Sequence, residues 1–438
     1  MTPNKNTNNK NARAVALEAL KKCESCGQYS NIALDNALKR SELSSSDRGL
    51  ATTIFYGVIE KKITLNYYIS ALSSRNINEI DKNTLILLEM GIYQLKFLDR
   101  IPDHAAINET VSLATAKTKG FVNAILREFT RRADKVALPS RDEGEAYSLS
   151  VRFSVCEALT ERFISVFGYD RSESLLSSFS EESGITLRTN TLKISRDELV
   201  ARLGGVPTVL SPYGIKTSGQ VGELSGFDEG LFYVQDESSQ LCAMAVGAKR
   251  GEVVIDTCSC PGSKSFGIAV DMENVGKLYS FDLHKNKLSL VESSAKRLGI
   301  DIIVTGERDG RAPDESLIGK ADRVLCDVPC SGFGVLGKKP ELRYKDPTES
   351  AALPAIQYDI LKNSAKYLKR GGVLVYSTCT VLPEENEKNV EKFLSEFPDF
   401  SLTPFVAGKL EVPSGMLTLL PDEYGTDGFF IAKLTKCK

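Results

Sequence analysis

The chain has 438 residues, of which 42% are hydrophobic and 26% are charged, and its formal net charge at pH 7 is −2. This length exceeds what one hydrophobic core usually spans, so we expect two or three domains in this chain. The composition is that of an ordinary soluble globular protein. A chain this long needs no disulfide staples, so its ten cysteines need not be paired.

The N-terminus and the apolar stretches bear on localisation. Residues 1–11 are polar and lack the apolar core of a signal peptide. The longest apolar stretch, 85–98, is interrupted by Glu89, Gln94 and Lys96 and is too polar to cross a bilayer. We therefore expect a cytoplasmic protein with no membrane partner, whose cysteines stay reduced.

Charge is distributed unevenly along the chain. Residues 1–140 carry a balance of +6 and the remainder carries −8. A basic module attached to a mildly acidic one suggests a polyanionic partner, although random surface variation explains the same numbers equally well.

The first part of the chain has a helical pattern. Residues 1–11 are expected to form a disordered tail, and 12–140 an all-α bundle, because apolar residues recur with helical spacing and no strand–helix alternation is found. Residues 133–147 are polar and resemble a linker. Residues 148–245 mix helical segments with short strands, as expected of a small α+β subdomain.

The pattern changes at Gly251 to short apolar strands that alternate with helices. This alternation predicts a doubly wound parallel sheet, a Rossmann-like domain over 246–438. In such sheets ligands bind at the carboxyl ends of the strands. The predicted strands are 253–255, 278–281, 302–304, 324–326, 373–376 and 429–434.

Polar and small residues follow the first three of these strands. Residues 256–264 read DTCSCPGSK, a turn of small residues that lets the backbone approach a cofactor, but one with neither GxGxxG nor P-loop spacing. Asp282 ends the second strand, where an acid suits ribose hydroxyls, and Asp309 follows the third. Taken singly, a tight connection or a solvated acid explains each of these features as well.

Two cysteines follow the next two strands. Residues 327–334 read DVPCSGFG and 377–380 read STCT, which places Cys330 and Cys379 at the mouth of the same crevice. A buried structural role is usual for one thiol, but two thiols at neighbouring strand ends, one close to Asp327, favour chemistry.

These motifs resemble those of the Nop/Sun family of RNA cytosine-C5 methyltransferases. DTCSCPGSK is similar to the family's D-x-C-A-A-P-G-G-K, and DVPCSGFG to D-A-P-C-S-G-x-G. Residues 377–387 (STCTVLPEENE) resemble T-C-S-x-x-x-x-E-N-E, and 426–430 resemble its D-G-F-F. The sequence departs from the family at Ser259-Cys260, Ser263 and Thr380.

The resemblance implies the chemistry and the residue roles. Cys379 would attack C6 of the base, Cys330 would assist release, and Asp327 would contact the base edge near the reacting methyl group. The cofactor would be S-adenosylmethionine, with Asp282 at the ribose and Asp309 at the adenine. Its methionine part would lie on the loop formed by Cys258, Ser259, Cys260, Pro261, Gly262, Ser263 and Lys264, while Asp327 lies near the methyl group.

The helical part has a resemblance of its own. Residues 101–106 and 121–127 are similar to the NusB-like RNA-binding domain. A NusB-like bundle, a small α+β linking subdomain and this catalytic domain together form the layout of a bacterial enzyme that modifies 16S rRNA. The resemblance implies 16S rRNA as the substrate and a monomeric protein, while tRNA remains open as an alternative.

Other interpretations carry less weight. Cys23 and Cys26 have the spacing of half a zinc site, but the chain has only two histidines, so no metal is expected. An RNA-binding module with a vestigial catalytic part would not need both cysteines. A nicotinamide oxidoreductase would need the missing GxGxxG turn.

Overall fold

The computed structural model describes residues 11–26, 30–181 and 184–437, so residues 1–10 of the expected tail lie outside the described part. The chain divides into two compact units. Unit 1 consists of residues 1–176 together with 338–346, and unit 2 of residues 177–337 together with 347–438.

Unit 1 is helical, and its core is formed by apolar residues of the first six helices. Helix starts follow local capping chemistry: Ser44 accepts a hydrogen bond from the backbone N–H of Asp47, and Asp81 from that of Thr84. The helices are α1 (Ala12–Cys26), α2 (Ser30–Lys39), α3 (Ser45–Leu72), α4 (Lys82–Phe97), α5 (Asp103–Ser112), α6 (Lys119–Arg132), α7 (Glu145–Phe153) and α8 (Glu157–Phe167), and α9 (Tyr169–Ser178) contains the boundary of the unit.

A short segment from far along the chain completes unit 1. The 3₁₀ helix η6 (Pro340–Tyr344) contacts α3, and the Tyr344 hydroxyl enters the hydrogen-bond ladder of that helix. It accepts from Lys62 N at 3.1 Å and bonds to the carbonyl oxygen of Ile59, while Ile63 N donates to Ser154 Oγ at 2.9 Å. Side-chain hydroxyls thus replace backbone partners in the middle of α3.

Arg343 fixes the same segment from its other side. Its side chain is fully buried, and its Nη1 donates to the carbonyl oxygen of Phe153 at 2.8 Å. The backbone N–H of Cys156 donates to the Arg343 carbonyl at 2.7 Å. A buried guanidinium needs such partners, so we infer that this segment belongs to the core of unit 1.

Unit 2 contains a mixed sheet in the order β10-β14-β9-β8-β5-β6-β7, with β13 also paired to β14. The five strands from β9 to β7 are parallel, whereas β14 is antiparallel to β9. The strands are β5 (Val253–Asp256), β6 (Lys277–Asp282), β7 (Ile303–Glu307), β8 (Ala321–Asp327), β9 (Leu368–Thr378), β10 (Phe400–Leu402), β13 (Met416–Leu419) and β14 (Phe429–Lys436).

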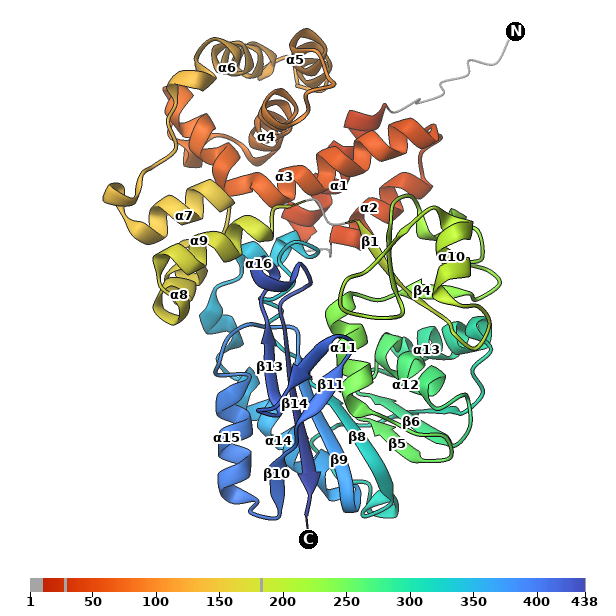
Figure 1. Ribbon diagram of the computed structural model, residues 1–438. Coiled ribbons are helices and arrows are strands. Elements are labelled where there is room, and N and C mark those ends of the chain that lie inside the picture. The colour runs from red at the N-terminus through yellow and green to blue at the C-terminus, as the bar shows by residue number, and fades with distance from the viewer. Residues whose placement is uncertain (1–10, 27–29, 182–183, 438) are drawn as a thin grey trace, which may run out of the picture. The chain divides into compact units, whose positions relative to one another are not determined.

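Helices cover both faces of this sheet, as expected of a doubly wound fold (Figure 1). Alternate strand residues enter two different cores: Val254 and Leu325 pack on one face, and Ile255 and Val324 on the other. The first core includes α11 (Glu237–Val246), α12 (Ser263–Asp271) and α13 (Lys285–Leu298), and the second includes α14 (Leu353–Lys366) and α15 (Glu387–Glu396).

Smaller elements of unit 2 lie outside the main sheet. A four-stranded antiparallel sheet has the order β2-β3-β1-β4, and Leu187, Ile215 and Phe232 form its core with Leu199 of α10 (Arg196–Leu203). These strands are β1 (Ile185–Thr189), β2 (Val206–Pro207), β3 (Gly214–Thr217) and β4 (Phe232–Val234). The pair β11 (Phe405–Ala407) and β12 (Leu410–Val412) and helix α16 (Pro421–Tyr424) lie near the end of the chain.

Among the described residues, no helix is both long and apolar enough to span a membrane. The described residues also contain no group of three or more His, Cys, Asp or Glu side chains that could hold a metal ion.

Candidate functional site

The predicted site residues follow strands at the point where the strand order reverses. The first strand of the domain, β5, lies between β6 and β8. The next strands, β6 and β7, are added on one side of β5, and β8 and β9 on its other side. Asp256 ends β5 and Asp327 ends β8. A crevice at such a reversal is the usual ligand site of open α/β sheets.

The two predicted thiols lie together. Cys330 Sγ is 3.2 Å from Cys379 Sγ, and the backbone N–H of Cys379 donates to Cys330 Sγ at 3.3 Å. Both side chains are half-buried. The bond to Cys379, together with burial, raises the pKa of Cys330 well above its ordinary value. In this arrangement Cys330 holds its proton.

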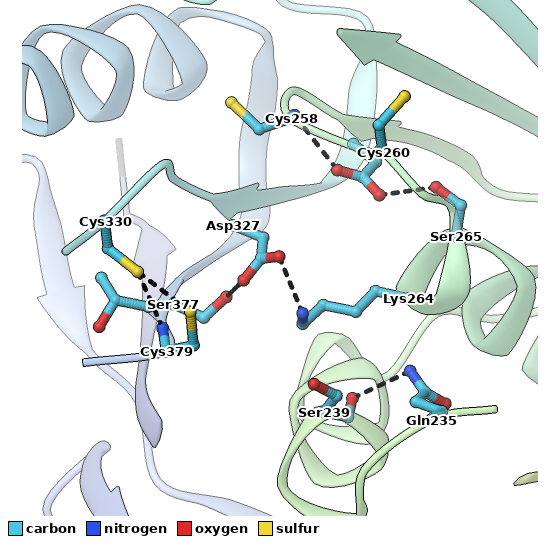
Figure 2. A network of polar contacts seen from close by, with 12 residues as sticks. Gln235, Ser239, Cys258, Cys260, Lys264, Ser265, Asp327, Cys330, Ser377 and Cys379 are labelled. Atoms are coloured by element: carbon cyan, nitrogen blue, oxygen red, sulfur yellow. Dashed lines mark hydrogen bonds and ion pairs between the residues drawn. The ribbon is translucent and has the colours of Figure 1, made fainter. Parts of the chain in front are cut away.

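Asp327 lies between a lysine and a serine (Figure 2). Lys264 Nζ donates to Asp327 Oδ2 at 2.8 Å, and Ser377 Oγ donates to Oδ1 at 2.7 Å. Burial is the largest influence on the pKa of Lys264 and lowers it, but the charge and hydrogen bond of Asp327, together with the nearby thiols of Cys242 and Cys379, outweigh burial, so the pKa is raised. Lys264 is therefore a permanent cation beside the thiols.

The loop after β5 is held by buried polar contacts. Asp256 Oδ1 accepts from the backbone N–H of Cys258 at 3.3 Å, and Oδ2 accepts from Ser265 Oγ at 2.6 Å. Ser265 Oγ also lies 2.9 Å from Ser280 Oγ in the neighbouring strand. Burial raises the pKa of Asp256 to about 7, so the carboxyl is on the border between its acid and carboxylate forms near neutral pH.

The other predicted loop residues have distinct surroundings. Gly262 has a φ of +105°, and a Cβ there would lie 2.6 Å from the Phe266 ring, so glycine is required. Burial raises the pKa of Cys258 well above its ordinary value and that of Cys260 to about 12, which makes both thiols poor nucleophiles. Of the remaining loop residues, Ser259 is buried, Pro261 is exposed and Ser263 begins α12.

Asp282 and Asp309 follow the next two strands, β6 and β7. Asp282 accepts backbone hydrogen bonds from Cys260 at 3.3 Å and from His284 at 2.9 Å, which fix its carboxylate at the end of β6. Asp309 instead pairs with Arg311 at 2.7 Å, and this bond lowers the pKa of Asp309. In the part of the chain that the structure describes, no hydrogen bond or ion pair links Asp309 to Cys330 or Cys379.

The sequence alone did not single out several residues of this site. Ser377 pairs in register with Asp327 across β8 and β9, a relation that only the strand register reveals. Glu385 accepts from the backbone N–H of Ser331 at 2.9 Å, next to Cys330. The acidic residues after the T-C motif are the sequence signal for Glu385, whereas Asp256 stands out only as the first residue of the loop motif.

The comparisons with known proteins agree with this architecture. A family model described as 16S rRNA methyltransferase RsmB/F matches residues 243–435, and a NusB family model matches residues 10–131. The chain is 38% identical to the probable ribosomal RNA small subunit methyltransferase B of Bacillus subtilis, over 97% of this chain and 98% of that protein. It is 37% identical to the protein of the same name from Synechocystis, over 97% and 99%. The crystal structure of PH0851 matches with a TM-score of 0.78 and 27% identity, over 96% of this chain and 97% of that one.

Proposed function

Because the chain belongs to the RsmB/F family of small-subunit rRNA methyltransferases, we propose that it methylates C5 of a cytosine in 16S rRNA through a covalent cysteine adduct. The observation that carries this proposal is the pair of thiols, Cys330 and Cys379, 3.2 Å apart beside the Lys264–Asp327 ion pair. A methyltransferase acting on an oxygen or an exocyclic nitrogen has no need of a thiol pair, whereas C5 of cytosine is a weak nucleophile that a thiol addition at C6 activates.

The residues after the first three strands fit S-adenosylmethionine. The loop from Cys258 to Lys264 approaches the crevice with small side chains, and Asp282 offers carboxylate oxygens suited to a ribose diol. Asp309 would serve the adenine amino group after releasing Arg311. When bound, the cofactor supplies an electrophilic methyl group.

Cys379 acts as the nucleophile. Its sulfur forms a bond to C6 while the C5–C6 electron pair shifts toward C4 and N3, where Asp327 stabilises the base edge by hydrogen bonding. Carbon C5 then takes the methyl group. In the last step a base removes the C5 proton, the C5–C6 double bond re-forms, and the C6–S pair returns to Cys379 as thiolate.

Cys330 serves as that base, and its protonation changes during the reaction. In the resting site the hydrogen bond to Cys379 is the largest cause of its raised pKa. Once Cys379 is a thioether it can no longer carry a negative charge, so its contribution is lost and the pKa of Cys330 falls, while burial and Glu385 continue to raise it. Cys330 then loses its proton to solvent more readily and can accept the proton from C5.

The experiment that tests the function measures labelled methyl transfer in vitro. The purified full chain, incubated with 16S rRNA and labelled S-adenosylmethionine, is expected to yield 5-methylcytosine on nucleoside analysis. Label in another nucleoside would contradict the proposal. A parallel reaction with tRNA identifies the substrate, and efficient transfer to tRNA alone would contradict the choice of 16S rRNA.

Asp282→Ala is expected to weaken cofactor binding. A hydrogen bond to a charged group contributes about 1.5–3 kcal/mol, which corresponds to a rise in Kd of about 10- to 150-fold. Titration calorimetry with S-adenosylmethionine measures the change. Asp301→Ala is the control, since Asp301 lies before the amino end of β7, whereas Asp282 lies at the carboxyl end of the neighbouring strand β6; an equal loss in both variants, or in neither, would contradict the assignment of Asp282.

Three exposed basic residues in α6 and just before it are expected to bind RNA phosphates. Lys117, Lys119 and Arg127 are exposed. Replacing all three with Gln in the full chain should weaken RNA binding and reduce the slope of log K against log salt by about 2–3, because each lost phosphate contact removes about 0.7–0.9.

A control with the same loss of charge tests whether the position matters. Lys249, Arg250 and Lys277 are exposed and lie at the amino ends of β5 and β6, away from the predicted crevice. Their replacement with Gln should leave the salt slope unchanged. Equal slopes for the two triple variants would contradict a specific role for the α6 residues.

A further inference from the structure

A buried carboxylate lies next to the thiol pair and has no part in the mechanism described above. Glu385, in the loop between β9 and α15, has a relative exposure of 3%. Its Oε2 accepts two hydrogen bonds, from Ser331 N at 2.9 Å and from Gln357 Nε2 at 2.7 Å. A buried charge is kept in a fold only with such partners, and these partners surround Cys330.

Gln357 extends the contact to the other side of Cys330. This fully buried side chain of α14 also donates from Nε2 to the carbonyl oxygen of Pro329 at 3.0 Å. Its Oε1 accepts from Asn389 Nδ2 at 3.2 Å, which fixes the orientation of the amide. The residues before and after Cys330 are therefore both tied to the Glu385 carboxylate, one directly and one through Gln357.

The same loop is anchored to β9, the strand that ends directly before Cys379. The Tyr376 hydroxyl donates to the Glu385 carbonyl oxygen at 2.5 Å. Ser331 Oγ donates to Thr380 Oγ1 at 2.9 Å. The position of Cys330 relative to Cys379 is thus set by a polar network, with Glu385 accepting from the Cys330 side and held to β9 on the Cys379 side.

We propose that Glu385 is a positioning residue for Cys330, and that its carboxylate holds the releasing thiol against the attacking one. The inference rests on the proposed function and adds a residue to its release step. Loss of the carboxylate leaves Ser331 N without its acceptor and Gln357 Nε2 with Pro329 as its remaining acceptor, so Cys330 no longer meets the C5 proton in a fixed geometry. Attack by Cys379 needs no such help.

The charges around the two thiols support the assignment of attack to Cys379 and of release to Cys330. Lys264 attracts a negative charge on Cys379, whereas Glu385 is among the groups that raise the pKa of Cys330, after the bond to Cys379 and burial. The ionisable groups that act on Cys330 are Cys379, which directly follows β9, and Glu385 on the same loop, while Cys330 in turn raises the pKa of Tyr376 on β9. Glu385 therefore helps to keep the proton of the resting pair on Cys330.

The test separates methyl transfer from release. Glu385→Gln keeps the shape of the side chain but removes its charge, and Glu385→Ala removes both acceptors. In a single-turnover reaction with 16S rRNA and labelled S-adenosylmethionine, we expect transfer within about threefold of the unmodified protein in both variants. Release of methylated RNA, measured on a denaturing gel, should slow at least fivefold in Glu385→Gln and more in Glu385→Ala.

Glu384→Gln is the matched control. Glu384 is on the same loop but forms its ion pair with Lys388 at 3.3 Å. This change should leave transfer and release unaltered. Thermal melting shows whether each variant is folded, and should Glu385→Ala fail to melt cooperatively, Glu385→Gln decides the question.

Each outcome has a distinct meaning. Parallel losses of transfer and release without an adduct, or normal release in Glu385→Gln, would overturn the positioning role. If Cys330→Ala traps RNA in the same experiment and Glu385→Gln does not, only this inference fails. If neither variant traps RNA, covalent catalysis fails too, and the inference with it.

Discussion

Cys330→Ala is expected to leave the protein covalently joined to its RNA. The variant retains Cys379 and can attack and methylate the cytosine, but it lacks the Cys330 sulfur that is proposed to remove the C5 proton. Incubation with 16S rRNA and S-adenosylmethionine should therefore produce a slow-migrating species on a denaturing gel, because a thioether at C6 survives denaturant. RNase treatment should return this species to the position of the free protein.

The double variant Cys330→Ala/Cys379→Ala is the control for this adduct. It should form none, since no sulfur remains to attack. A packing role for Cys330 predicts a less stable protein and no trapped RNA, and that result would count against the release role. Buried Cys326, the last residue before Asp327, offers a second control, because Cys326→Ala should trap nothing.

Cys379→Ala is expected to abolish methyl transfer while binding of the cofactor and RNA persists. The substitution removes the sulfur that makes C5 nucleophilic in the proposed mechanism, so turnover should fall by at least about three orders of magnitude, as for other covalent nucleophiles. A labelled-methyl assay measures the rate, and calorimetry measures the cofactor Kd.

The opposite pattern would reverse the roles of the two cysteines. Near-normal turnover of Cys379→Ala, or an adduct trapped by it, would make Cys330 the nucleophile. The 3.2 Å separation of the sulfurs allows either one to approach the base, so these two single variants, compared side by side, decide the assignment.

Much of the fold could be predicted because its signals are local. The helical spacing of the N-terminal part and the strand–helix alternation after Gly251 gave the all-α bundle and the doubly wound sheet, and the comparisons confirm both. The antiparallel pairing of β14 with β9 was not predicted, because strand direction depends on contacts across the sheet.

The site could be predicted only where a motif follows a strand. Cys330, Cys379, Lys264 and Asp327 belong to such motifs, and the structure brings them together; their roles remain predictions. Gln357 carries no motif at all, since it is one polar residue on a helix whose neighbours are decided by packing.

The insertion of Tyr344 into α3 has a consequence for biosynthesis. Unit 1 consists of residues 1–176 and 338–346, so its last part leaves the ribosome about 160 residues after the rest. At about 5–20 residues per second, this delay amounts to roughly 8–30 s. During that time the peptide groups near Ile59 and Lys62 lack the hydroxyl of Tyr344, and the site of buried Arg343 is empty. A nascent chain in this state exposes an unfinished core, so we expect chaperones to bind it during this interval. An N-terminal fragment truncated before residue 338 would remain in the same state.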